Sequence, residues 1–195
     1  VVRDSVVLGG KDASLNWMQA MSGSTLHAAG DSGRVLRSTD DGATWSEQTL
    51  TTNTLTGGHF PTASVGYVAS VTGQTWRTGN GGDSWSARAS AADSLNGLWF
   101  TSSNTGFGIG RNGGIYKTEN DANTWFTLVS NTQSNLNGIS FPSASVGYVV
   151  GENETILKTL NGTASASSAP EFGGIVWSPI AGGWFSQTSG TAQEI

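Results

Sequence analysis

Four of the nine basic residues in this 195-residue chain recur at a spacing of about 40 positions: Arg37, Arg77, Lys117 and Lys158. A row of cations could bind a polar or anionic partner, or it could brace neighbouring carboxylates and loop carbonyls within the protein. Both interpretations stay open at this point. Two tryptophans on expected innermost strands could stack on a ligand, so the candidate partner-binding residues are these four cations with Trp99 and Trp184.

Acids and histidines raise the question of a bound metal. Three acids in repeated stretches could offer oxygen ligands to calcium, namely Asp40, Asp41 and Asp121. In two other copies of the stretch Asn80 and Asn161 occupy the Asp40 position, and an uncharged amide is a poor substitute where charge is needed. His27 and His59 have no second histidine or cysteine nearby. We therefore predict no metal and no cofactor.

The acids lie in a turn that the chain repeats. Residues 38–45 read Ser-Thr-Asp-Asp-Gly-Ala-Thr-Trp, and residues 78–85 and 118–125 follow the same pattern. The Asp or Asn side chain can accept backbone N–H bonds, glycine allows positive φ, and the tryptophan opens the next strand. The predicted structural positions are Ser38, Asp40, Gly42, Trp45, Thr78, Asn80, Gly82, Trp85, Thr118, Asn120, Trp125, Thr159, Asn161 and Trp177.

The elements that position these turns repeat with the same period. Successive box tryptophans are 40 residues apart, the segments between them are strand-rich, and no helical pattern is present, which is typical of propeller blades. Each unit divides into four short strands ending at Gly, Asn, Asp or Ser. The sequence therefore predicts an all-β propeller with blades at about 15–54, 55–94, 95–135 and 136–181.

The fourth unit departs from the pattern. Its box begins at Thr159, but the tryptophan comes only at Trp177, which indicates an insertion at 163–174. Gly183-Trp184-Phe185-Ser186 resembles the first strand of the third unit, so residues 182–195 could form a fifth blade with residues 1–10. The alternative is an arc of a larger ring.

Ser-x-Asp-x-Gly-x-Thr-Trp at 38–45 resembles the Asp-box, or bacterial neuraminidase repeat. Leu-Asn-Gly-Ile-Ser-Phe at 136–141 and Thr-Ile-Leu-Lys-Thr at 155–159 make the chain similar to the photosystem II stability and assembly factor type of repeat. The resemblance covers about residues 15–190. It implies a propeller that binds a partner, and in that family a basic patch is associated with partner binding. Because such repeats serve many functions, the resemblance is specific for the fold alone.

Sialidases also contain this repeat, and their chemistry needs three converging arginines, a Tyr–Glu pair and an acidic Asp. The three tyrosines here, Tyr67, Tyr116 and Tyr148, lie at matching or neighbouring repeat positions, which indicates blade packing. No phosphate loop, nucleophile elbow or zinc helix is present. We therefore predict that the protein is not an enzyme.

Composition limits the remaining classes. The net charge of −5 argues against a nucleic-acid partner, and no apolar run is long enough to span a membrane. The chain has no cysteine, and only 12% of its residues are charged. We expect an extracytoplasmic location (secreted, cell-surface or resembling the thylakoid lumen), or a virion.

Three function classes remain. The first is a non-catalytic scaffold that engages a protein or other macromolecule through its loop faces, as the resemblance implies. The second is a structural surface or virion protein (a decoration, tail or filament subunit) that assembles with itself. The third is a glycan-binding or sialidase-like domain. The mass of the chain in solution separates the first two classes.

Overall fold

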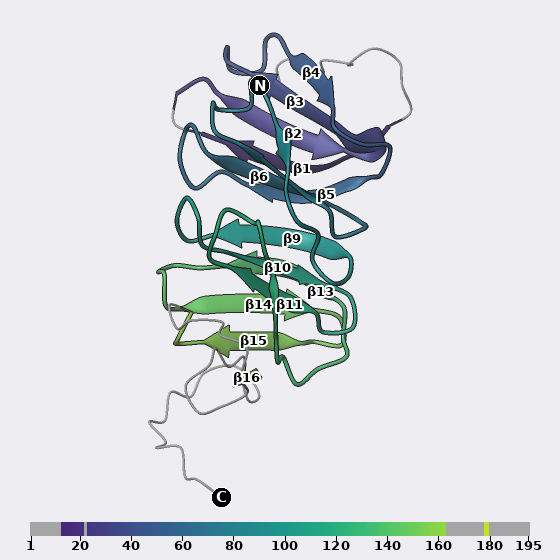
Figure 1. The fold of residues 1–195 in the computed structure, drawn as a ribbon, viewed down its shortest axis with the longest axis vertical. Helices are drawn as coiled ribbons and strands as arrows, with labels where there is room; N and C mark the ends of the chain where they lie inside the picture. The colour runs from purple at the N-terminus through teal and green to yellow at the C-terminus, as the bar shows by residue number, and fades with distance from the viewer. Residues whose placement is uncertain (1–12, 22, 163–177, 180–195) are drawn as a thin grey trace, which may run out of the picture.

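The computed structural model describes residues 13–21, 23–162 and 178–179, and these residues form four antiparallel four-stranded sheets. The sheets, which we call blades 1 to 4, follow one another along the chain (Figure 1). Their strands are β1 Leu15–Ala20, β2 Leu26–Gly30, β3 Arg34–Ser38 and β4 Ser46–Thr49; β5 Leu55–His59, β6 Gly66–Ser70, β7 Thr75–Thr78 and β8 Ser86–Ala87; β9 Leu95–Phe100, β10 Gly106–Gly110, β11 Ile115–Thr118 and β12 Phe126–Leu128; β13 Leu136–Ser140, β14 Gly147–Gly151, β15 Ile156–Thr159 and β16 Ser178–Pro179.

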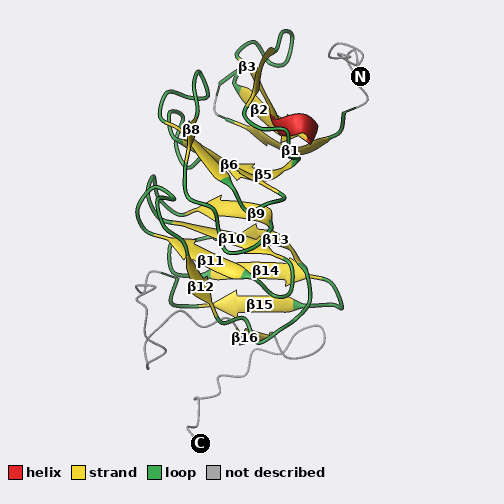
Figure 2. Cartoon of the chain, turned by 45° about the vertical axis from the view of Figure 1, so that its right-hand side comes forward, coloured by secondary structure: helices red, strands yellow, loops and turns green. Residues whose placement is uncertain are grey.

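The blades are arranged as an arc, with blade 1 and blade 4 at opposite ends of the long axis (Figures 1 and 2). The first strand of each blade packs beside the first strand of the next, so that β1, β5, β9 and β13 form the inner layer. The only helical turn among the described residues is a 3₁₀ turn at Asp31–Gly33. The prediction of an all-β propeller built from four-stranded blades is confirmed.

The repeated turn owes its shape to side-chain acceptors. In blade 1 the Asp40 carboxylate accepts the Thr44 backbone N–H at 2.8 Å and the Ser38 hydroxyl at 2.8 Å. In blade 2, Asn80 accepts the Ser84 N–H at 3.0 Å, so an amide oxygen does the same work as a carboxylate oxygen. Gly42 has φ +86°, a conformation that favours glycine. The turn chemistry therefore explains why this position accepts Asp in one blade and Asn in the other three.

The hydrophobic core lies between blades. Three clusters of buried side chains fill the three junctions, and each junction contains a ring-on-ring stack. The ring centroids are 3.9 Å apart for His27 and Phe60, 3.6 Å for Tyr67 and Phe100, and 4.4 Å for Phe107 and Phe141. In each pair the first ring comes from the second strand of one blade and the second ring follows or ends the inner strand of the next. Each blade therefore depends on its neighbour to cover its apolar face.

The fourth strand of blade 4 lies beyond the predicted insertion. Ser178 pairs with Lys158 as Ser46 pairs with Arg37 and Ser86 with Arg77, so Ser178 occupies the same register. The 163–174 insertion, Trp177 and Trp184 lie outside the described residues, as do the segments 1–10 and 182–195 that we expected to close the ring.

Candidate functional site

A groove of about 480 Å³ runs across the inner strands of all four blades. None of the described side chains that line it is charged; the described lining consists of asparagine, glutamine, threonine, histidine, tryptophan, methionine, aliphatic residues and glycine. The volume of the groove lies in the range of small-molecule binding sites, and its lining combines apolar side chains with amide groups. We call it the inner-strand groove.

The second residue of each inner strand belongs to a β-bulge. The register shifts between Leu15 and Trp17 in blade 1, and the same shift recurs once in each of the other inner-strand pairings. A bulge re-aims a side chain out of the regular alternation. Here it turns the second residue toward the next blade, so the groove floor also holds the blades together.

These bulged residues form a clasp to the main chain of the next blade. Asn16 donates through Nδ2 to the Leu55 carbonyl at 3.1 Å, and Asn96 donates to the Leu136 carbonyl at 2.9 Å. Thr56 makes the same bond with its hydroxyl. The second residue of the inner strand of blade 4 is Asn137. Its side chain is exposed and forms no hydrogen bond within the described residues. We call this set the inner clasp.

A second set of bonds joins the fifth residue of one inner strand to the backbone of the next. Gln19 donates to the Phe60 carbonyl at 3.1 Å and accepts the Phe60 N–H at 2.9 Å. His59 accepts the Phe100 N–H through Nδ1 at 3.2 Å. Burial lowers the pKa of His59 to about 4, which keeps the ring neutral at neutral pH. Because Nδ1 accepts, Nε2 carries the proton and can donate.

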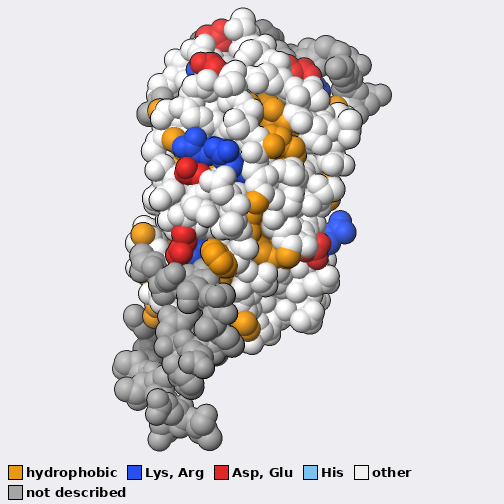
Figure 3. All heavy atoms as spheres, in the orientation of Figure 1, with side chains coloured by type: hydrophobic (Ala, Val, Ile, Leu, Met, Phe, Trp, Pro, Cys, Tyr) orange, Lys and Arg blue, Asp and Glu red, His pale blue; other side chains and the backbone are white. Residues whose placement is uncertain are grey.

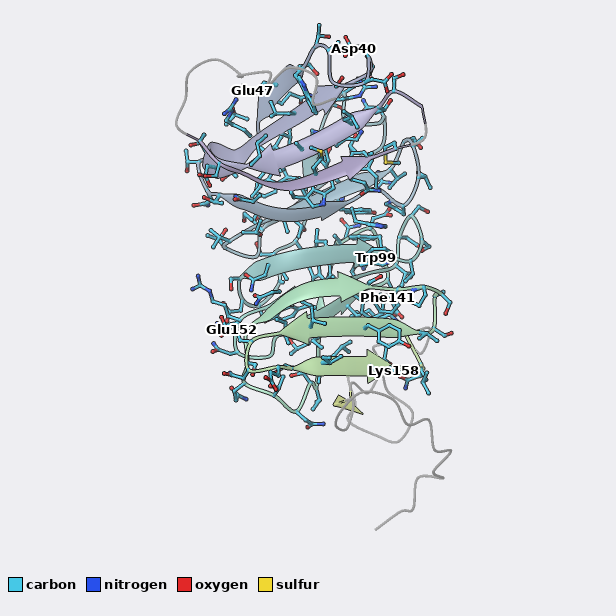
Figure 4. All side chains as sticks on the ribbon, turned by 180° about the vertical axis from the view of Figure 1, so that it is seen from behind. Asp40, Glu47, Trp99, Phe141, Glu152 and Lys158 are labelled. Carbon is cyan, nitrogen blue, oxygen red and sulfur yellow. The ribbon has the colours of Figure 1, made fainter. Side chains whose placement is uncertain are left out.

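Trp99 lies where the inner-strand groove meets a second hollow. This rim cleft, of about 370 Å³, is lined by the ends of the inner strands of blades 2, 3 and 4 and the residues that follow them, including Pro61 and Pro142. Trp99 and His59 line both hollows, and their rings are 4.4 Å apart between centroids. The Trp99 indole N–H donates to no atom of the described residues, and its ring is half-buried. Figure 4 shows Trp99 on the same side of the arc as Phe141.

The row of basic residues lies outside both hollows and forms internal contacts. Arg37 forms an ion pair with Asp83 in the turn of blade 2, and Arg77 lies 3.6 Å from Asp121 in the turn of blade 3. Lys117 is buried and lies 2.8 Å from Glu119 in its own blade. These three contacts correspond to the bracing interpretation of the row.

Lys158, the last of the row, lies on the open end blade. Its ammonium nitrogen is 5.5 Å from the centre of the Tyr148 ring, and the side chain is half-buried. It lies on the same side of the arc as Trp99 (Figure 4). The face drawn in Figure 3 carries few charged side chains among the described residues.

The residues considered as metal ligands do not converge. Within the described ranges no group of three or more histidine, cysteine, aspartate or glutamate residues could hold a metal ion. Hydrogen bonds from Thr44 and Ser38 lower the pKa of Asp40 to about 2, so turn donors already engage this carboxylate. His27 is buried against Phe60, and burial together with the charge of Arg37 lowers its pKa to about 4.

The described lining of the groove offers groups for binding and contains no carboxylate and no arginine. Glycoside hydrolysis usually requires two carboxylates facing the scissile bond, and none of the described residues that line the inner-strand groove is an aspartate or a glutamate. The arginines that a sialidase would need are also missing from that lining. Aromatic faces, amide groups and a neutral imidazole suit stacking and hydrogen bonding to an uncharged ligand.

The structure brings together only part of the predicted set. Trp99 lies in the groove, as its place on an innermost strand suggested, while the four basic residues lie elsewhere. Sequence reasoning missed Gln19, His59 and the inner clasp. The repeated asparagine at positions 16, 96 and 137 was visible, but its role depends on the bulge, which the residue pattern alone does not reveal.

No protein-family model and no curated protein matches this chain. Solved structures do match. A structure described as "YCF48 bound to D1 peptide" superposes with a TM-score of 0.65 at 15% identity, covering 89% of this chain and 55% of that one. YCF48 from Cyanidioschyzon merolae gives a TM-score of 0.67 at 17% identity, covering 89% and 58%. An ancestral GH74 enzyme gives 0.67 at 18% identity, covering 86% and 24%.

At these identities the likeness shows the fold alone, and the fold is that of a β-propeller. The chain spans little more than half the length of the two YCF48 chains and about a quarter of the GH74 enzyme. One fold neighbour is described with a bound peptide and another as an enzyme, so the function must be argued from the site. Within the described residues no helix is long and apolar enough to cross a membrane.

Proposed function

We propose that this protein is a non-catalytic scaffold that binds an extended, largely uncharged segment of a partner protein. The observation that carries the proposal is the junction of the inner-strand groove and the rim cleft at Trp99 and His59. An extended peptide has a polar main chain and side chains on alternate sides. The groove matches this chemistry with amide and imidazole groups beside the face of an indole ring.

The likeness to YCF48 supports the same proposal, since one of those structures is described with a bound peptide. The uncharged groove lining distinguishes the proposed ligand from an acidic or basic peptide. An extracytoplasmic location belongs to this proposal and rests on the resemblance to secreted and lumenal repeat proteins. A glycan ligand is the second candidate, because Trp99 offers the aromatic face on which sugars stack.

The test is peptide selection followed by calorimetry. A phage library of short random peptides is selected on the immobilised full chain, and the best peptide is titrated into wild-type protein and a Trp99→Ala variant. We expect the variant to lose about 2 kcal/mol of binding free energy, as interface aromatics do, which is roughly a thirtyfold rise in Kd. The exposed Val129, which lies in neither hollow, supplies the matched control Val129→Ala.

One further variant and a glycan array separate the alternatives. If Lys158→Ala weakens peptide binding and Trp99→Ala does not, the basic row is the binding surface and the groove proposal is wrong. A parallel glycan array identifies the second candidate, because sugar binding that depends on Trp99 without any selected peptide would replace a protein partner with a glycan. Glycan turnover by the wild-type chain would contradict the non-catalytic assignment.

A further inference from the structure

The two end faces of the arc carry the two halves of the junction that joins the blades. At the junctions between blades 1 and 2 and between blades 3 and 4, the upstream blade supplies two apolar residues, one from its second strand and one from its third. Between blades 2 and 3 the third-strand residue is the buried Thr75. At all three junctions the downstream blade supplies the first residue of its inner strand. Between blades 3 and 4 these residues are Ile109, Ile115 and Leu136, and all three are fully buried in one cluster. Leu55 and Leu95, the first inner-strand residues of blades 2 and 3, are fully buried as well.

Blade 4 presents the upstream half of this junction to solvent. Val150 and Ile156 occupy the positions of Ile109 and Ile115 and are 47% and 45% exposed. Tyr148 occupies the position of Tyr67 and Phe107, the rings that stack on the next blade, and is only half-buried. Asn137 carries the unused copy of the inner clasp on the same face.

Blade 1 presents the downstream half. Leu15 occupies the position of Leu55, Leu95 and Leu136, yet it is 48% exposed. Met18 is 61% exposed where its counterpart Leu98 is 4% exposed. The Leu15 carbonyl lies at the place where the carbonyls of Leu55 and Leu136 accept their clasp bonds. The blade 1 face therefore has the downstream half of the junction without an upstream half, and the blade 4 face has the upstream half without a downstream half.

We infer that two copies of this chain associate head to tail, the blade 1 face of one copy docking on the blade 4 face of the next. Leu15 then packs on Val150 and Ile156 as Leu136 packs on Ile109 and Ile115, and Asn137 donates to the Leu15 carbonyl. The argument rests on continuity with an interface that the chain already uses three times. Because two different surfaces meet, the contact is heterologous and produces either a closed ring or a filament.

The sequence spacing of Trp184 argues against a further copy of the inner strand with this tryptophan at the position of Trp99. Trp184 resembles Trp99, but it follows Ser178 by only six residues, whereas Trp99 follows the equivalent Ser86 by thirteen. A chain leaving the outermost strand must cross the three strand spacings of its blade, about 14 Å, before it can begin a new inner strand. The six positions from Ser178 to Trp184 are too few for both the crossing and the start of a strand with Trp184 at the position of Trp99.

The test uses two variants of the full chain, each of which places an aspartate on a different end face. Light scattering over a wide concentration range should show wild-type protein in species heavier than the 20.1 kDa monomer. Leu15→Asp and Ile156→Asp alter exposed sites on opposite ends, and each alone should remain monomeric. An equimolar mixture of the two variants should form a one-to-one dimer, because each partner keeps the intact face that the other needs.

Each alternative gives a different result. Monomeric wild-type protein at every concentration would overturn the inference and indicate that residues of the same chain cover the faces. A Leu15→Asp variant that stays oligomeric, or a mixture without a dimer, would show that the contact is not head to tail. Met18→Asp and Val150→Asp repeat the pairing if a first variant unfolds. Val129→Asp is the control, because this residue is 67% exposed on blade 3.

Discussion

His27 and His59 are two titratable residues whose burial should make the free energy of unfolding depend on pH. The pKa of each is lowered from 6.5 to about 4 in the folded chain. His27 packs its ring on Phe60, and His59 accepts a backbone N–H through Nδ1, which a protonated ring cannot do. Both residues therefore favour the folded state only while they are neutral.

We expect the free energy of unfolding to fall as the pH is lowered from about 6.5 to about 4. In that window the unfolded chain binds protons that the folded chain does not, so stability is full above pH 6.5 and is lost toward pH 4. The loss should be on the order of 1–3 kcal/mol for each histidine, allowing for partial solvent screening of the half-buried His59. Urea unfolding at pH 7 and at the acidic end of this window measures it.

The other blades supply a matched variant. Tyr67 and Phe107 occupy the His27 position, and Gln19 occupies the His59 position with equivalent bonds. The double variant His27→Phe, His59→Gln should keep the fold and flatten the pH dependence in this window. If the slope were unchanged, other groups would be responsible for it. Asp40, whose pKa is lowered to about 2, contributes only at still lower pH.

The inner clasp is one of the features that join each blade to the next, and its contribution to stability can be measured strand by strand. We expect Asn96→Ala to cost about 1–2 kcal/mol of unfolding free energy, because it leaves the Leu136 carbonyl without its donor. Asn137→Ala removes the same side chain at the equivalent position of blade 4, where no described residue is bonded to it, and should change stability by less than about 0.5 kcal/mol. Urea denaturation measures both.

Two controls sharpen this comparison. Asn96→Thr should recover part of the loss, because Thr56 makes the same bond in blade 2. Both asparagine variants should be measured in the Leu15→Asp background, which prevents the proposed association. Equal losses for Asn96→Ala and Asn137→Ala would show that the blade 4 face is already covered within one chain.

The strands were largely predictable from the sequence, and the clasp was not. All four inner strands begin at the residue where the sequence predicted a new blade to begin, at 15, 55, 95 and 136, because each strand is a short apolar run bounded by turn residues. The role of the basic row could not be decided, because Asp83 and Asp121 belong to neighbouring blades whose side-by-side placement is a property of the fold. The position of Trp99 in the groove was predictable from its place on an inner strand, but its ring contact with His59 was not.

The whole molecule is an arc of similar units, each stabilised by its neighbours. Blades 2 and 3 are covered on both sides, whereas each end blade has one covered face within the described residues. In such quasi-one-dimensional proteins local stability depends on the number of interfaces that a unit shares. The middle of the chain should therefore be the most stable part.

Amide hydrogen exchange followed by mass spectrometry would show this gradient. At low protein concentration we expect slow exchange in β5 to β11 and faster exchange in β1 and in β13 to β15. Raising the concentration should slow exchange at the two ends of wild-type protein and leave Leu15→Asp unchanged. Uniform protection along the arc at low concentration would contradict the picture of two uncovered ends.

The inner clasp also bears on how such a chain can change during evolution. Each clasp donor is a side chain, while each acceptor is a main-chain carbonyl that any residue supplies. A blade copied or deleted by unequal recombination would therefore meet a competent acceptor in its new neighbour without a compensating substitution there. The near-identity of residues 60–68 and 141–149, which belong to blades that are not adjacent, is the kind of trace that such an event leaves in a gene.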